Sequence, residues 1–183
     1  AGLVSGETLL LSSTGLFDTK DAGIGKTVTA TVTLGNGSGL ASNYLLADGG
    51  PLTSTADITP KLLTLAGLSA VTREYDGSRA VKLAGTGALS GLVGTETLGF
   101  TLASGLFDTK DAGVGKTVTA SLQLVDGGNG GKAGNYTLPN DGKASFSGTI
   151  LPKSLTVSGI AAADKVYDGS TVASVSVGSV QGL

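Results

Sequence analysis

An internal repeat constrains the fold of this chain more than any other feature of its sequence. The nine residues 15–23 recur without change as residues 105–113, and the likeness continues from residues 25–30 to residues 115–120. Shorter segments recur 92 positions later, among them Asn43-Tyr44, Pro60-Lys61 and Tyr75-Asp76-Gly77-Ser78. A period of this length predicts that the chain is built from copies of one structural module.

Two prolines set the expected bounds of the modules. Pro60 and Pro152 occupy equivalent positions, and proline interrupts a strand ladder because it has no backbone N–H to donate. We therefore expect one complete module at residues 62–153. Residues 1–61 would be the C-terminal part of a preceding module, and residues 154–183 the N-terminal part of the next. From these boundaries we expect the sequence to be an excerpt from a longer array of modules.

Alternating apolar and polar residues predict β-strands. Residues 27–34 alternate apolar side chains with threonine, and residues 117–124 repeat the alternation, which is typical of a strand with one buried face. Further strands are expected at residues 63–68, 80–83, 98–103, 136–138 and 144–150. Six or seven short strands in each repeat favour an all-β fold, a tandem array of antiparallel Ig-like β-sandwich modules of about 90 residues. A β-grasp-like module with a short helix at residues 109–113 is the alternative.

The apolar positions of these strands predict one core for the module. Aromatic residues are only 4% of the chain, so this core would consist mostly of aliphatic side chains. We expect it to contain Leu65, Phe100, Val118, Ala120, Leu122, Tyr136 and Phe146. Although 31 of the 183 residues are glycine, a hydrophobic content of 40% and a net charge of −2 are unlike those of a disordered chain.

Composition also excludes several classes of function. The chain has no His or Cys, so it offers no imidazole or thiolate nucleophile, no ordinary zinc or copper site and no disulfide. Its net charge of −2 gives no electrostatic attraction to nucleic acid. No apolar run approaches the length of a membrane-spanning helix. We expect neither an enzyme nor a cofactor, because each carboxylate belongs to a repeated turn rather than to one tuned active site.

The recurring polar motifs are interpreted as structural. In a Tyr-Asp-Gly turn the tyrosine ring packs, the aspartate accepts backbone N–H bonds, and the glycine adopts a positive φ. In the Asn-Tyr motif the asparagine completes a turn and the tyrosine anchors the core. The residues assigned these roles are Tyr75, Asp76, Gly77, Asn135, Tyr136, Tyr167, Asp168 and Gly169.

Pairs of aspartates in the repeated loop are candidates for a calcium site. Calcium needs six or more oxygen ligands, so two aspartates would need a further carboxylate such as Glu7 or Glu96. The lysine between each pair disfavours a cation. We expect no bound metal, and instead an aspartate that caps a turn beside a solvated lysine. The candidate residues are Asp18, Asp21, Asp108 and Asp111.

Four blocks of this sequence resemble those of a known family. Residues 165–171 resemble the signature of the YDG and MBG repeat domains, residues 111–118 the second block of the family, residues 134–138 the third, and residues 58–61 the joint between modules. The blocks follow the family order. Such domains are known to occur in tandem in very large bacterial surface proteins, including filamentous-haemagglutinin-like adhesins. One copy has Arg73-Glu74-Tyr75 where the other has Lys165-Val166-Tyr167.

The resemblance implies a location at the cell surface or outside the cell, usually of a Gram-negative bacterium, and a role in adhesion, a stalk or a biofilm matrix. We expect a structural spacer whose partners are the neighbouring modules of the same protein. The alternative is an adhesion module that binds surface glycans or other copies. Such a module should carry exposed aromatic residues or a charged patch in one copy. The sequence indicates neither, which favours the spacer.

The two incomplete modules lead to an expectation about assembly. An unpaired sheet edge invites another strand. Residues 154–183 should therefore pair with a segment equivalent to residues 1–61, supplied either by a continuing chain or by a neighbouring copy. The continuing chain is favoured, because tandem repeats normally fold from their own strands.

Overall fold

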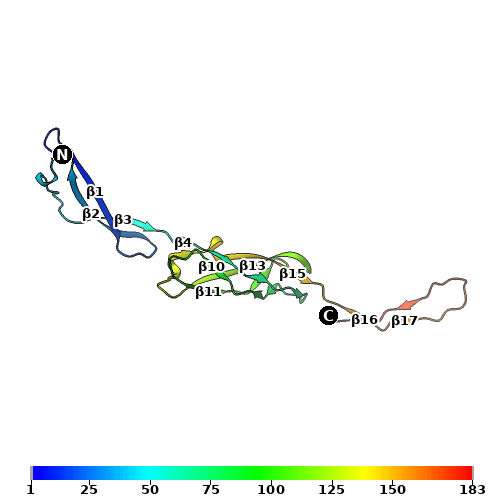
Figure 1. Cartoon of the computed structure of the whole chain (residues 1–183). Helices are drawn as coiled ribbons and strands as arrows, with labels where there is room; N and C mark the ends of the chain where they lie inside the picture. The colour runs from blue at the N-terminus through cyan, green and yellow to red at the C-terminus, as the bar shows by residue number, and fades with distance from the viewer. Residues whose placement is uncertain (1, 183) are drawn as a thin grey trace. The chain divides into compact units, whose positions relative to one another are not determined.

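The computed structural model describes residues 2–182, and its regular structure is almost entirely β (Figure 1). The helical elements of this described part are 3₁₀ turns, namely η1 (Ala41–Asn43), η2 (Ala133–Asn135) and η3 (Pro139–Gly142). The expectation of an all-β fold is confirmed. The short helix of the β-grasp alternative is wrong, since residues 108–111 form a bend and the following strand begins at Gly113.

The strands of the first third are β1 (Leu9–Phe17), β2 (Gly23–Asn36), β3 (Leu52–Ile58) and β4 (Lys61–Leu62). Those of the middle are β5 (Thr64–Ala66), β6 (Ser69–Ala70), β7 (Arg73–Glu74), β8 (Ala80–Val81), β9 (Leu83–Ala84), β10 (Ala88–Ser90), β11 (Leu98–Leu102) and β12 (Gly105–Phe107). The remaining ones are β13 (Gly113–Asp126), β14 (Tyr136–Thr137), β15 (Lys143–Leu151), β16 (Thr156–Ser158), β17 (Ala161–Ala162), β18 (Val175–Ser176) and β19 (Ser179–Gln181).

These elements form two compact units, each assembled from segments that are distant in the sequence. The first unit contains the described residues up to Thr64 together with Leu89–Phe100 and Leu124–Asp141. The second contains Leu65–Ala88, Thr101–Gln123 and the described residues from Gly142 onward.

The first unit contains an antiparallel sheet of β1, β2 and β3. The expected alternation of residues 27–34 is present, because the threonines of this stretch of β2 are exposed and its apolar side chains are half-buried. Phe17 of β1 lies opposite Val28 of β2, and Ala56 of β3 lies opposite Lys26. Figure 1 draws this sheet as a single layer.

The second unit holds a six-stranded sheet with the order β7-β15-β13-β12-β8, and β11 also pairs with β13. A cluster of Val81, Phe107, Val118 and Ile150 forms its buried core. Half-buried side chains packed against this cluster are Ala70, Tyr75, Leu83 and Phe146. The core therefore joins strands from both ends of residues 62–153.

The expectation of wholly antiparallel pairing is wrong at two places. β14 runs parallel to β4, with Tyr136 opposite Lys61, and β15 runs parallel to β7, with Ile150 opposite Arg73. In both pairs the two strands lie far apart in the sequence. Apolar periodicity identifies the buried face of a strand but not the direction of its neighbour, so these parallel pairs could not be predicted from the sequence pattern.

The expected core is correct in part. Val118, Ala120, Leu122 and Tyr136 are buried, whereas Leu65, Phe100 and Phe146 are only half-buried. The expectation of one core is wrong. Val118 and Phe146 belong to the second unit, whereas Phe100 and Tyr136 belong to the first.

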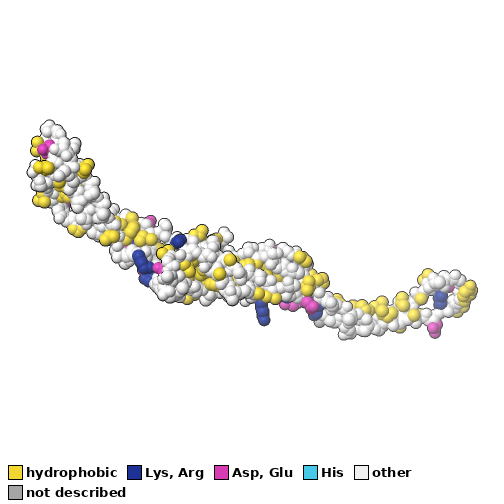
Figure 2. Space-filling model, in the orientation of Figure 1, with side chains coloured by type: hydrophobic (Ala, Val, Ile, Leu, Met, Phe, Trp, Pro, Cys, Tyr) yellow, Lys and Arg dark blue, Asp and Glu magenta, His cyan; other side chains and the backbone are white. Residues whose placement is uncertain are grey.

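Residues 154–182 repeat the local pairing of residues 62–91. β17 pairs with β18, just as β6 pairs with β9 at the equivalent positions 92 residues earlier. The burial differs, because every described residue of the later segment is exposed. Figure 2 shows hydrophobic side chains at the surface of this segment. The same sequence pattern thus forms the same ladders with and without a packed core.

Candidate functional site

The repeated loop is built identically in both copies. The Asp18 carboxylate accepts a hydrogen bond from the backbone N–H of Thr19 at 2.8 Å, and it lies 3.0 Å from the Lys26 ammonium. In the later copy Asp108 accepts the same bond from Thr109 at 2.8 Å and pairs with Lys116 at 3.3 Å. In both copies hydrogen bonds hold the pKa of the aspartate below its usual range. The largest cause is the bond from Lys26 at Asp18 and the bond from the Thr109 backbone N–H at Asp108.

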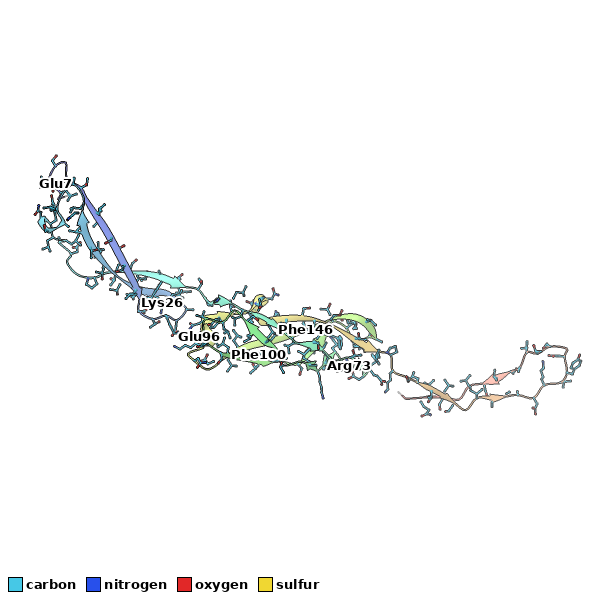
Figure 3. The ribbon with its side chains drawn as sticks, viewed as in Figure 1. Glu7, Lys26, Arg73, Glu96, Phe100 and Phe146 are labelled. Carbon is cyan, nitrogen blue, oxygen red and sulfur yellow. The ribbon has the colours of Figure 1, made fainter. Side chains whose placement is uncertain are left out.

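A tyrosine and a glutamate form a second repeated contact. The Tyr136 hydroxyl donates to Glu96 Oε2 at 2.6 Å and accepts from the backbone N–H of Val93 at 3.1 Å. The equivalent Tyr44 hydroxyl donates to Glu7 and accepts from the backbone N–H of Val4. Figure 3 places Glu7 at the far end of the β1–β2 pair from Lys26. The tyrosine therefore ties the start of the first long strand to the loop after the second.

The loop of one repeat also contacts the next repeat, within the first unit. Asn135 Nδ2 donates to Asp21 Oδ1 at 2.9 Å, and Asn135 Oδ1 accepts from the backbone N–H of Ala22 at 2.7 Å. Lys132 Nζ lies 2.5 Å from Asp21 Oδ2, and Lys20 Nζ lies 3.0 Å from Glu96 Oε1. We call this set of residues, Lys20, Asp21, Ala22, Glu96, Lys132 and Asn135, the joint.

Charges in the joint are complementary, and the pKa values reflect this. The bond from Asn135, followed by that from Lys132, lowers the pKa of Asp21 from 3.8 to about 2. The bond from Tyr136, followed by that from Lys20, lowers the pKa of Glu96. Both carboxylates are therefore ionised at neutral pH, opposite the lysines that they contact.

A backbone contact lies beside the joint. Leu63 is fully buried, and its N–H donates to the Thr137 carbonyl at 2.8 Å, which continues the parallel pair of β4 and β14. A small cleft of the first unit opens here, lined by Lys20, Ala22, Ile58, Thr59, Lys61, Val93, Glu96, Asn135 and Tyr136. The residues that follow Pro60 are thus held by backbone pairing with β14, beside the side-chain bonds of the joint.

The Tyr-Asp-Gly turn carries a basic residue that closes it. The Arg73 guanidinium contacts Asp76 and donates to the Ser78 carbonyl at 2.6 Å, while its Cζ lies 5.5 Å from the centre of the Phe107 ring. Asp76 accepts from the Ser78 backbone N–H at 2.8 Å, and Gly77 has a φ of 78°. The structural interpretation of Asp76 and Gly77 agrees with this geometry.

The second copy of this turn uses lysine in place of arginine. Lys165 Nζ lies 2.8 Å from Asp168 Oδ1 and donates to the Ser170 carbonyl at 2.8 Å. Gly169 again has a positive φ, of 69°. The basic residue before the tyrosine thus closes the turn in both copies. Tyr167 itself is 93% exposed, whereas Tyr75 packs against the core, so the expectation of no exposed aromatic residue is wrong.

The calcium candidates face lysines rather than other carboxylates. Asp18, Asp108 and Asp21 each lie against an ammonium group, from Lys26, Lys116 and Lys132 respectively. Asp111 has no hydrogen-bond or ion-pair partner among residues 2–182. No three acidic side chains of the described chain gather in a way that could hold a metal ion. Glu7 and Glu96, considered as further ligands, instead accept bonds from tyrosines.

Sequence reasoning missed the joint and the tyrosine–glutamate contact. A usable signal existed for the contact, because a Glu-Thr-Leu segment recurs at Glu7 and Glu96, each ahead of an Asn-Tyr pair. No comparable signal existed for Lys132, since Leu40 occupies the equivalent position of the other copy.

The fold and the contacts define an all-β chain in which the same loop, turn and tyrosine contact are each built twice. The model of the YDG domain family matches residues 1–52 and 59–144, and the chain therefore belongs to this family. No curated protein and no solved structure showed significant similarity to it. None of the helices in residues 2–182 has the length and apolar character needed to cross a membrane.

Proposed function

We propose that this chain is a stalk or spacer segment of a large secreted bacterial adhesin or biofilm-matrix protein. Its modules, bounded at Pro60 and Pro152, would be sandwich-like repeats that follow one another in tandem. Each module would add a fixed length between the attached end of the protein and its binding end. This role is non-catalytic, and its location is outside the cell.

The joint carries this proposal. A single exposed ion pair contributes little stability, about 0–1 kcal/mol. Asn135, however, donates to Asp21 and accepts from the N–H of Ala22, so two bonds of opposite direction fix the orientation of the loop. The Lys20–Glu96 pair adds a third point of attachment. These three contacts link one repeat to the next through three residues of one loop, and we expect them to restrict bending between the repeats.

The family resemblance supports the extracellular location, and the composition is compatible with it. A chain with no cysteine needs no particular redox environment to fold. Stability here comes from backbone ladders, local turns and a small aliphatic core. The resemblance to tandem domains of bacterial surface proteins adds the cellular context.

The test of the proposal is a replacement within the parent surface protein. Residues 62–153 would be deleted, or exchanged for an unrelated rigid module of equal length, and adhesion of the cells would be measured. A spacer predicts that deletion impairs adhesion and that the unrelated module restores it. A binding function of this segment predicts loss in both variants.

A further inference from the structure

Tension on a spacer acts where the chain enters and leaves each module. For residues 62–153 these places are Pro60 and Pro152. The first strand after Pro60 is β4, and the last strand before Pro152 is β15 (Figure 1). A pull on the chain from both sides therefore reaches the module through β4 and β15, so the bonds of these two strands decide how the module responds.

Each of these two strands has a parallel partner from the other half of the module. β4 pairs with β14, with Lys61 opposite Tyr136, and β15 pairs with β7, with Ile150 opposite Arg73. In each pair the earlier strand is pulled from its N-terminal end and the later strand from its C-terminal end. Because the strands are parallel, these are opposite ends of the ladder, and tension slides one strand along the other.

The direction of loading determines how many hydrogen bonds resist the pull. In an antiparallel pair the same tension would act at one end of the ladder and break its bonds one after another. The bonds of a ladder run across its strands, so sliding strains them together and they must break together. Forced unfolding depends on the barrier to unfolding rather than on the equilibrium stability. A module with a small core can therefore still resist force.

A buried side chain reinforces each parallel ladder. Leu63, directly after β4, is fully buried, and its N–H donates to the Thr137 carbonyl at 2.8 Å. Ile150 of β15 is 1% exposed, and the carbonyl of the next residue, Leu151, accepts from the Tyr75 N–H at 2.9 Å. Sliding of either strand would break these bonds and bring an apolar side chain into water, which costs free energy.

The partner strands are themselves fixed by side chains. The Tyr136 hydroxyl of β14 donates to Glu96 and accepts from the Val93 N–H. Arg73 of β7 donates to the Ser78 carbonyl and contacts Asp76. β14 and β7 therefore cannot simply follow the strands that are pulled.

We infer that residues 62–153 form a load-bearing module with two clamps, β4 with β14 where the chain enters and β7 with β15 where it leaves. Both clamps are complete within residues 61–151. The inference rests on the proposed function, since only a segment that transmits tension between two attached ends needs such a device.

The experiment pulls single molecules of the 183-residue chain in two directions. The chain has no cysteine, so Thr55→Cys and Ser154→Cys provide unique handles outside the clamps. A second variant has Thr119→Cys and Ser145→Cys, on β13 and β15, at residues that lie opposite each other. All four positions are exposed. The first handles load the clamps along their ladders, whereas the second handles separate two antiparallel strands sideways.

We expect the rupture force to be about twofold or more higher through the first handles than through the second. The first handles should give one rupture that releases about 300 Å of chain, the extended length of roughly 90 residues. Equal forces in the two directions, or release in several small steps at low force, would overturn the inference. Either result would leave the spacer role standing, because the exchange of modules in cells tests that role separately.

Substitutions at Tyr75 test the exit clamp directly. Tyr75→Pro removes the N–H that bonds to Leu151, whereas Tyr75→Ala keeps this N–H and removes the same ring. Proline should lower the rupture force through the first handles more than alanine does, and the two variants should differ little through the second handles. Circular dichroism establishes that both variants keep their β structure. Equal rupture forces for proline and alanine through the first handles would contradict a load on this ladder.

Discussion

Asn135 binds Asp21 across 114 positions of sequence, and its side-chain amide also accepts a bond from the next residue of the same loop, Ala22. An asparagine side chain has both donors and an acceptor, so it can satisfy a carboxylate and a backbone N–H at once. Asp111 has the same neighbours in sequence as Asp21 but no such partner among the described residues. The loop that contains Asp21 can therefore be compared with the loop that contains Asp111, which has the same sequence but lacks these contacts.

Removing the Asn135 amide should raise the pKa of Asp21. That pKa is lowered from 3.8 to about 2 chiefly by the Asn135 bond. A carboxylate with a lowered pKa stabilises the folded form at pH values above its ordinary pKa. This stabilisation disappears as the pH falls through the lowered pKa. In Asn135→Ala, an NMR titration of the Asp21 carboxyl should show a midpoint nearer 3.8. Asn43→Ala is the matched control, and equal midpoints in the two variants would contradict the assignment.

Truncation of Phe107 should destabilise the chain far more than truncation of Phe17. Phe107 is fully buried, so Phe107→Ala should cost about 3–5 kcal/mol. Phe17 occupies the equivalent position on a partly exposed face, and Phe17→Ala should cost much less under dilute conditions. Phe146→Ala should also cost less, because that ring is only half-buried. Urea unfolding measures the order, and similar costs at Phe107 and Phe17 would argue against the described core.

Gly105 and Gly15 provide a second matched pair. A Cβ at Gly105 would lie 3.0 Å from side-chain atoms of both Val118 and Val81, whereas one at Gly15 would lie 3.2 Å from a Val28 methyl and 3.9 Å from the Thr29 carbonyl oxygen. Overpacking a core typically costs about 1–3 kcal/mol. Gly105→Ala should therefore lower the unfolding midpoint clearly more than Gly15→Ala does. A larger effect at Gly15 would mean that β8 does not cover Gly105.

Calcium should leave the thermal unfolding of the chain unchanged. Lysine ammonium groups already neutralise the carboxylates of Asp18 and Asp108, and a cation would have to displace them. Scanning calorimetry in calcium and in chelator should give the same midpoint. A rise of many degrees with calcium would make the aspartates of the loop ligands instead.

Sequence periodicity predicted the central parts of the long strands β2, β13 and β15, and the buried face of β13, because Val118 and Leu122 alternate with polar residues along one strand. It did not predict β1, β3 or β12. Turn chemistry likewise predicted the Asp76 bond and the positive φ of Gly77. These features depend on neighbours within a few positions, which is the range over which a sequence pattern acts.

The joint could not be predicted in this way. Asp21 and Asp111 lie in identical segments, yet only Asp21 meets an asparagine and a lysine from another repeat. Burial shows the same dependence on distant partners, since Leu63 is fully buried whereas the equivalent Leu155 is exposed. What differs in each case is the part of the chain that packs against the segment.

The most direct test of the spacer account is the distance distribution between two spin labels placed on either side of the joint. The chain has no cysteine, so Thr31→Cys and Ser90→Cys provide unique attachment sites on exposed positions of β2 and β10. At a concentration where the chain is monomeric, electron–electron resonance should give one narrow distribution, which the double variant Lys20→Ala/Asp21→Ala broadens. The matched variant Lys110→Ala/Asp111→Ala should leave it narrow. A broad distribution in the unaltered chain, or a narrow one that survives loss of Lys20 and Asp21, would contradict the claim that the joint holds successive repeats in a fixed geometry.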